Sequence, residues 1–156
     1  MIKIDRRSIS ALAVSAVALV GLAMSEGYSD KAIIPVPGDV PTIGFGTTHG
    51  VKMGDTTTPQ KALVRALQDV QKFEGAMRQC VTVPLTQYEY DAYLQLSYNT
   101  GSTAFCNSTL VRKLNAADYP GACKEILRWD KFKGKPLRGL TLRRQEEYKQ
   151  CMGVIQ

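Results

Sequence analysis

Residues 26–46 read EGYSDKAIIPVPGDVPTIGFG, an acidic residue followed by β-branched residues and a glycine-rich end. The β-branched residues between Ile33 and Phe45, divided by the turn signal Pro37-Gly38-Asp39, predict a β-hairpin over this stretch. Glu26 stands just before the hairpin and just after a long apolar stretch. We therefore expect a small β-structure near the N-terminus, with an acidic residue at its edge.

The longest predicted helix follows the hairpin. Thr58 is a suitable N-cap, and Pro59 occupies the first helical position. Apolar residues then recur at helical spacing, namely Leu63, Ala66, Leu67, Val70, Phe73 and Met77. The helix should run from Pro59 to about Arg78, roughly 30 Å at about 1.5 Å per residue, which is a length that suits a connection between two lobes.

The remaining chain carries further helix signals. Thr86 and Glu89 form a capping box that opens a helix over Gln87–Tyr98. Two short helices are predicted over Ser108–Asn115 and Pro120–Trp129. A Gly- and Lys-rich loop should cover Lys131–Gly139, and Thr141 should cap a last helix that runs to about Cys151. The sequence thus predicts a mainly helical α+β fold, in which the long helix joins a small N-terminal hairpin lobe to a helical C-terminal lobe.

The stretch Ser8–Ser25 contains no charged residue, and Lys3, Arg6 and Arg7 precede it. Basic residues before an apolar run are typical of segments that engage the secretion machinery. As a helix, these 18 residues reach roughly 27 Å, just enough to cross a bilayer. Three interpretations stay open: a signal peptide cleaved near Gly21-Leu22-Ala23, a stable anchor, and an anchor too weakly apolar to stay. A functional Glu26 favours a segment that is retained.

Charge and cysteine content narrow the function classes. The formal net charge is +6, which favours an anionic partner such as nucleic acid, a membrane surface or an acidic polymer. The densest basic group is Lys131, Lys133, Lys135, Arg138, Arg143 and Arg144, which is either a solvated surface or a groove for such a polymer.

The four cysteines are widely spaced and the chain has one histidine, His49, so we expect no metal site. The four cysteines should form two disulfides if the chain is exported, and should stay as reduced thiols otherwise.

Glu26, Asp39 and Thr42 are the candidate catalytic residues. Cleavage of a glycosidic bond needs a protonated acid at the leaving oxygen and a second polar group for water or for the developing positive charge. Glu26 follows an apolar helix, and partial burial favours the protonated form. Asp39 lies in a turn, and the hydroxyl of Thr42 is placed to hold a water molecule. Acids at helix ends and in turns are also common surface features.

Several of these motifs resemble the T-even phage lysozyme family, glycoside hydrolase family 24. The matching segments are Glu26-Gly27-Tyr28, residues 41–46, residues 97–101, residues 105–115, residues 121–123 with Arg128-Trp129, and Gly139-Leu140 with Arg143-Arg144. The resemblance implies a muramidase that hydrolyses the β-1,4 bond between N-acetylmuramic acid and N-acetylglucosamine. It also implies that Tyr98 and Ser108 contact substrate, although both residues also fit ordinary helix positions.

The family uses a Glu, an Asp and a Thr. Glu26 and Thr42 match directly, but the usual spacing puts Pro35 where the Asp is expected. We hypothesise that the hairpin is reshaped so that Asp39 takes this role, with Asp30 as the alternative. The family's histidine after the Gly-x-Gly is here Thr47.

Residues 1–25 resemble the signal-anchor-release segments of secreted phage endolysins and contain no cysteine. This implies a chain tethered by residues 8–25 to the host inner membrane, on the periplasmic side, and activated on release into the periplasm, with residues 26–156 as the catalytic domain. Among the three possible pairings of an exported chain we favour Cys80–Cys106 and Cys123–Cys151. The expected partner is peptidoglycan, with no cofactor, no nucleic acid and a monomeric state.

Two rival functions remain. A lytic transglycosylase would act on the same bond with one acid and leave an anhydro sugar, and Thr42 favours hydrolysis over this reaction. A non-catalytic wall-binding protein is the second rival, and Pro35 at the expected Asp position supports it.

Overall fold

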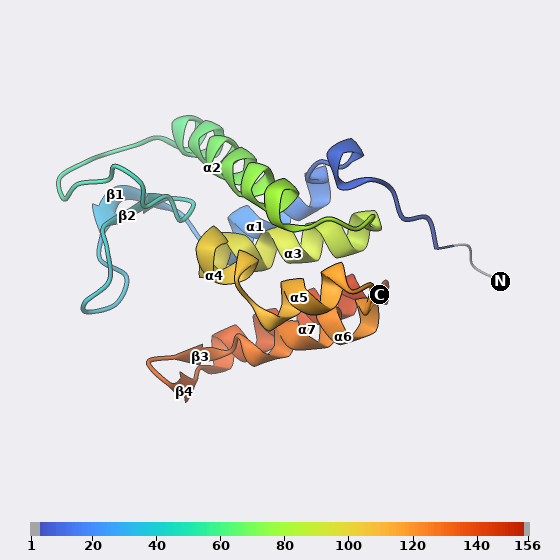
Figure 1. Ribbon diagram of the computed structural model, residues 1–156. Coiled ribbons are helices and arrows are strands. Elements are labelled where there is room, and N and C mark those ends of the chain that lie inside the picture. The colour runs from blue at the N-terminus through green and yellow to red at the C-terminus, as the bar shows by residue number, and fades with distance from the viewer. Residues whose placement is uncertain (1–3, 155–156) are drawn as a thin grey trace. The chain divides into compact units, whose positions relative to one another are not determined.

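The computed structural model describes residues 4–154, so Lys3 lies outside the described residues. The chain forms two compact units, one made of Ala16–Lys72 and the other of Met1–Ser15 with Phe73–Gln156. Figure 1 shows helices in most of the chain and short strands near residues 30–44 and 131–136. The predicted α+β class, mainly helical with small sheets, is confirmed.

The smaller unit, Ala16–Lys72, contains helix α1 (Ala16–Glu26) and an antiparallel pair of strands, β1 (Ser29–Ile33) and β2 (Thr42–Gly44). Ser29 lies opposite Gly44 and Ile33 opposite Thr42, with an irregularity between the two pairs. The predicted hairpin is therefore present, but its first strand begins at Ser29 instead of Ile33.

Residues 34–41 form a loop, although β-branched residues are frequent in them. Proline has no backbone N–H to donate to a strand ladder, and this loop contains three prolines. The predicted turn lies at the centre of the loop, where the backbone N–H of Asp39 donates to the carbonyl of Val36 over 3.0 Å. Gly38 follows Pro37 with a φ of 85°, which fits a type II turn.

Helix α2 (Pro59–Cys80) begins where the sequence predicts and ends two residues beyond Arg78. The Thr58 hydroxyl accepts from the backbone N–H of Lys61 over 3.4 Å, as expected of an N-cap. The helix starts in the smaller unit and ends in the larger one, so it joins the two. Its buried apolar side chains are Ala62, Ala66, Val70 and Met77. The prediction that Leu63 and Leu67 belong to this face is wrong, because they are 47% and 39% exposed.

The larger unit is helical. Its elements are α3 (Gln87–Thr100), α4 (Ser102–Cys106), α5 (Thr109–Asn115), α6 (Tyr119–Glu125), the 3-10 helix η2 (Ile126–Arg128), β3 (Lys131–Phe132), β4 (Lys135–Pro136) and α7 (Arg138–Cys151). Helix α3 starts at the predicted capping box, with both bonds between Thr86 and Glu89 formed. Helices α3 and α7 pack against each other, and Tyr90, Tyr93 and Leu94 of α3 are fully buried. These aromatic and aliphatic residues form the core of the unit.

Two predictions near the C-terminus need correction. The expected loop after residue 130 contains the small hairpin β3–β4, whose turn residues Lys133 and Gly134 both have positive φ. Two consecutive positive φ values suit the twist of a tight hairpin. The last helix begins at Arg138, so Thr141 is not its cap. The Thr141 hydroxyl instead bonds the carbonyl of Leu137 from within the first turn.

Both predicted disulfides are present. Cys80 at the end of α2 is bonded to Cys106 at the end of α4, and Cys123 of α6 is bonded to Cys151 at the end of α7. All four cysteines lie in the larger unit. The pairing favoured for an exported chain is therefore confirmed.

The apolar N-terminal stretch is divided into separate pieces. The 3-10 helix η1 (Ile9–Ala11) is followed by residues 12–15, which form neither helix nor strand, and α1 then begins at Ala16. Helix α1 continues through the expected boundary after residue 25 and ends at Glu26. None of the helices among residues 4–154 combines the length and the apolar character that a membrane span requires. A functional division at residue 25 stays a prediction.

Candidate active site

Glu26 is the last residue of α1 and is partly buried. Its carboxylate lies directly beside Gly46, because a methyl group placed on Gly46 would lie 2.9 Å from Glu26 Oε2 and 3.1 Å from its Cγ. The rings of Tyr28 and Phe45 pack at 5.3 Å between centroids. Two contacts therefore join the Glu26-Gly27-Tyr28 motif to the end of the hairpin.

A tight turn after β2 presents Gly46 to Glu26. Ile43 and Thr47 exchange two backbone hydrogen bonds of 2.9 and 3.0 Å across the turn. The turn requires positive φ at Gly44 (64°) and Gly46 (83°), a conformation that glycine adopts without strain. The Gly-x-Gly pattern thus has a local reason, and in this structure it leaves room for a carboxylate.

Thr42 is the first residue of β2 and is partly buried, and its hydroxyl donates to the carbonyl of Val40 over 3.1 Å. Successive side chains of a strand point to opposite faces. Ile43 is buried and lines a pocket beside α2, so the side chain of Thr42 belongs to the other face of the hairpin. This places the predicted catalytic hydroxyl away from that pocket.

The two candidate second carboxylates lie in different parts of the hairpin. Asp39 is exposed, and its Oδ1 accepts from the backbone N–H of Val40 over 2.8 Å. Asp30 is an exposed residue of β1 whose carbonyl accepts from the backbone N–H of Thr57. The hydrogen bonds described for Asp39 and Asp30 are formed with other residues of the smaller unit. The role of Asp39 stays a prediction.

Thr47, which stands at the family's histidine position, forms a buried hydrogen bond that the sequence does not predict. Thr47 is 2% exposed, and its hydroxyl donates to Asp69 Oδ2 over 2.6 Å. Asp69 is itself buried on α2, with Arg65 Nε 3.9 Å from its other oxygen. The Arg65 guanidinium also donates to the carbonyl of His49. One feature of the sequence could have indicated this contact. Asp69 is an acidic residue three positions after Ala66, so it lies close to the buried face of α2.

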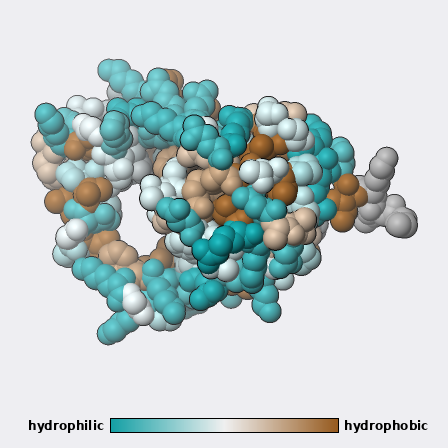
Figure 2. Space-filling view, viewed as in Figure 1, coloured by the Kyte–Doolittle hydropathy of each residue, from teal (hydrophilic) through white to brown (hydrophobic). Residues whose placement is uncertain are grey.

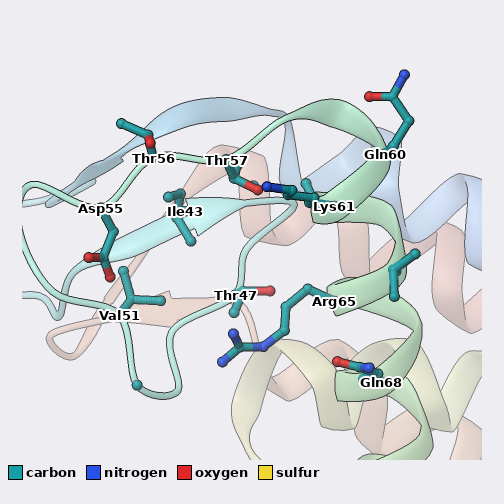
Figure 3. Close-up of a pocket in the computed structure, with 14 residues that line it drawn as sticks. Ile43, Thr47, Val51, Asp55, Thr56, Thr57, Gln60, Lys61, Arg65 and Gln68 are labelled. Carbon is teal, nitrogen blue, oxygen red and sulfur yellow. The ribbon is translucent and has the colours of Figure 1, made fainter.

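A pocket of about 540 Å³ lies between α2 and the loop that follows the Gly-x-Gly turn. Figure 3 shows Lys61 and Arg65 of α2 facing Ile43, Thr47 and Val51 across it. The residues that line this pocket include none of the predicted catalytic residues. Within residues 4–154, no group of three histidine, cysteine or acidic residues is placed to hold a metal ion.

The predicted substrate-binding residues belong to the larger unit. Tyr98 of α3 packs its ring against Phe73 at 5.1 Å between centroids and is partly buried. Ser108 is the N-cap of α5, where its hydroxyl accepts from the backbone N–H of Val111 and donates to the carbonyl of Phe105. Capping gives Ser108 a structural role, and substrate contact by either residue stays a prediction.

The basic group near the C-terminus is not a single surface. Arg144 is fully buried and is ion-paired with Glu147 of the same helix at 2.9 Å. Its predicted membership of the group is therefore wrong. Lys131, Lys133, Lys135 and Arg138 are exposed and contribute positive charge. The face shown in Figure 2 is mostly hydrophilic, with apolar residues gathered in separate places.

Comparisons with known proteins agree with this arrangement. Residues 23–147 match the family described as phage lysozyme. The chain is 36% identical to a SAR-endolysin of Pseudomonas phage phiKMV over 141 residues, covering 88% of this chain and 87% of that one. It is 38% identical to an endolysin of Salmonella phage P22, covering 80% and 88%. An endolysin structure from Escherichia coli O157:H7 phage FAHEc1 superposes with a TM-score of 0.80 at 32% identity, covering 93% and 96%. The chain belongs to the phage lysozyme family, whose members are muramidases acting on peptidoglycan.

Proposed function

We propose that this protein is an endolysin that hydrolyses the β-1,4 bond between N-acetylmuramic acid and N-acetylglucosamine, with Glu26 as the general acid. The observation that carries the proposal is the close approach of the Glu26 carboxylate to Gly46 at the end of the hairpin. The acid thus lies beside the Gly-x-Gly turn, and Thr42 is the first residue of the strand that leads into this turn.

The proposed reaction uses three groups. Glu26 in its protonated form donates a proton to the glycosidic oxygen as the bond to the anomeric carbon breaks. A water molecule held by the Thr42 hydroxyl and the Asp39 carboxylate adds to that carbon, and Asp39 accepts its proton. Asp39 stands three residues before Thr42 in the sequence, and this short spacing supports the division of roles.

The second part of the proposal concerns export. Residues 8–25 engage the secretion machinery and tether the chain in the host inner membrane, and activity begins after release into the periplasm. Three apolar side chains on one side of α1 support this, because Val17, Val20 and Met24 are 83%, 58% and 79% exposed. Exposure of an apolar face to water is unfavourable, whereas a bilayer would bury it. Two disulfides also fit a periplasmic destination.

The test is a turbidity assay on purified cell wall with the soluble full-length chain and with Glu26→Gln. The wild-type chain should clear the suspension, and Glu26→Gln should lose at least about 100-fold in rate because a general acid is removed. Mass spectrometry of the products should show hydrated reducing ends. Anhydro ends would establish a transglycosylase instead, and an inactive wild-type chain that still sediments with the wall would establish a binding protein.

A further inference from the structure

The pocket of about 540 Å³ described above lies between the first turns of α2 on one side and the hairpin with its following loop on the other. We call it the α2 pocket. All of its lining residues belong to the smaller unit. Its volume is within the range of roughly 300–1,000 Å³ that is usual for small-molecule sites. The α2 pocket can therefore hold a ligand of the size of a short peptide.

The side of the α2 pocket that α2 forms is positively charged. Lys61 and Arg65 lie four positions apart on the helix and both face the pocket (Figure 3). Like charges at this spacing destabilise a helix. Arg65 Nε lies 3.9 Å from Asp69 Oδ1, and no acidic side chain among residues 4–154 forms an ion pair with Lys61. An anionic group in the pocket would therefore relieve the repulsion between the two cations.

The opposite side of the α2 pocket carries an acid. Asp55 stands across the pocket from Lys61 and Arg65 (Figure 3). Its Oδ2 accepts from the backbone N–H of Lys52 over 2.9 Å, and its own N–H donates to the Lys52 carbonyl over 3.1 Å. These two bonds fix the orientation of the carboxylate. The α2 pocket thus offers a positive side to a carboxylate and a negative side to an amine.

Apolar side chains lie between the two charged sides. Ile43 of β2 is 9% exposed, and Val51 of the loop is partly buried. Both line the pocket, as do the hydroxyl-bearing side chains of Thr56 and Thr57. Small apolar groups of a ligand can therefore pack against Ile43 and Val51, while its polar groups reach the hydroxyls. This combination suits a short peptide with small side chains, a free carboxylate and a free amine.

The α2 pocket is separate from the proposed catalytic groups. Glu26, Asp39 and Thr42 are not among its lining residues, and the side chain of Thr42 belongs to the other face of the hairpin. A ligand in the pocket is therefore bound without being cleaved there. Peptidoglycan supplies a ligand of the required chemistry, because its glycan strands carry short peptides with alanine methyl groups, free carboxylates and, in many bacteria, a free amine.

We propose that the α2 pocket binds the peptide branches of peptidoglycan. Lys61 and Arg65 bind a peptide carboxylate, Asp55 binds the peptide amine, and Ile43 and Val51 contact the alanine methyl groups. The proposal rests on the proposed function, since it takes the wall as substrate. Binding away from the reacting bond acts equally on the substrate and the transition state, so it lowers the half-saturating wall concentration and leaves the maximal rate unchanged.

The first test measures peptide binding and needs no hydrolysis. The probe is the sugar-free tetrapeptide L-alanyl-D-glutamyl-diaminopimelyl-D-alanine, titrated into the soluble full-length chain and followed by NMR. The amide signals of Val51 and Gln68 should shift. Lys61→Gln combined with Arg65→Gln should raise the dissociation constant about tenfold or more, because hydrogen bonds to a charged group are lost. A tetrapeptide that leaves these amides unmoved, or that binds the double variant equally well, would overturn the proposal.

A control separates the pocket from general attraction between a basic protein and an acidic wall. Lys72→Gln combined with Lys133→Gln removes the same net charge from two exposed residues that do not line the pocket. This pair should leave the dissociation constant within about twofold of the wild type, because long-range attraction between exposed charges is screened by salt. An equal loss of binding in the two double variants would show that net charge alone decides, which contradicts the proposal.

The second test is wall hydrolysis. Lys61→Gln with Arg65→Gln should raise the half-saturating wall concentration about tenfold and keep the maximal rate within about twofold, because only uniform binding is removed. A fall in the maximal rate with an unchanged half-saturating concentration would contradict this role. A wild-type chain that binds the tetrapeptide but does not hydrolyse wall would refute the proposed enzyme function and leave the binding site standing.

Two single variants cover the case in which the double variant does not fold. Lys61→Gln breaks no described ion pair and should weaken tetrapeptide binding by itself. Asp55→Asn keeps an oxygen that can accept from the Lys52 amide, and it should weaken binding of the tetrapeptide but not of an analogue that lacks the free amine. Inorganic phosphate is the competing probe. Tighter binding of phosphate than of the tetrapeptide would assign the pocket to a phosphate-bearing ligand and overturn the proposal.

Discussion

The carboxylate of Glu26 and the α-carbon of Gly46 lie so close that a single methyl group on Gly46 would reach to 2.9 Å from Glu26 Oε2. The two residues are the end of a helix and the end of a tight turn. Their contact makes the position of the acid sensitive to the smallest change in the turn.

Gly46→Ala should therefore reduce wall hydrolysis by about 100-fold, because a displacement of about 1 Å of a catalytic group costs that much. Gly134→Ala is the matched control, since Gly134 has a similar φ of 79° and no atom within 4 Å of an added methyl group. Both variants bear the same backbone strain. Turbidity assays with urea unfolding of each variant measure the effect, and equal activities in the two variants would contradict it.

The identity of the second carboxylate can be decided by comparing two single variants. Asp39→Ala should lower the hydrolysis rate by about 100-fold or more, as expected for loss of a general base. Asp30→Ala should leave the rate close to that of the wild type, because Asp30 contributes its backbone carbonyl to the contact with Thr57. The reverse order of activities would transfer the role to Asp30.

The buried bond between Thr47 and Asp69 should stabilise the smaller unit. Thr47→Val keeps the shape of the side chain but leaves a buried carboxylate oxygen without its donor, and should lower the free energy of unfolding by about 1–3 kcal/mol. Thr47→Ser keeps the hydroxyl and should lose less. Urea denaturation measures both variants, and a Thr47→Val protein as stable as the wild type would show that the bond is dispensable.

Membrane release should depend on the apolar character of α1. Ala16 and Gly21 are exposed, and a side chain added at Gly21 meets no atom within 4 Å. Ala16→Leu combined with Gly21→Leu should hold the chain in the membrane fraction and abolish lysis, because leucine makes insertion more favourable. The control pair Ala16→Gln with Gly21→Gln should be released. Cell fractionation with a lysis assay gives the answer, and normal lysis by the leucine pair would contradict tethering.

Acid should weaken one ion-pair group of the larger unit. The hydrogen bond from Lys113, helped by Arg128, lowers the pKa of Glu125 below its usual value near 4.5. A carboxyl whose pKa is lowered by folding stabilises the folded state above its unfolded pKa, and this stabilisation is lost as the pH falls through the folded pKa. The melting temperature of Glu125→Gln should therefore lie below that of the wild type at neutral pH, and the difference should shrink as the pH falls below the usual pKa of a glutamate.

The features foreseen from the sequence are those with local causes. Thr58 and Pro59 predict the start of α2, Thr86 and Glu89 that of α3, and Pro37-Gly38 the turn of the hairpin. Each works through a cap or a backbone dihedral that involves neighbouring residues only. The disulfide pairing was predicted for an exported chain, and Glu26 was proposed as the catalytic acid because it follows an apolar segment and matches the family's motif.

Features that depend on distant parts of the chain were not foreseen. Leu63 and Leu67 have the right helical spacing for burial but are exposed, because the neighbours available to α2 decide which face is covered. The bond between Thr47 and Asp69, 22 positions apart, needs the folded hairpin. The backbone amides of Val14 and Ser15 are bound by Glu74 and Asp91, which lie 60 and 76 residues further along the chain. Short-range sterics start helices and turns, whereas burial and the partners of buried charges follow from packing across the whole chain.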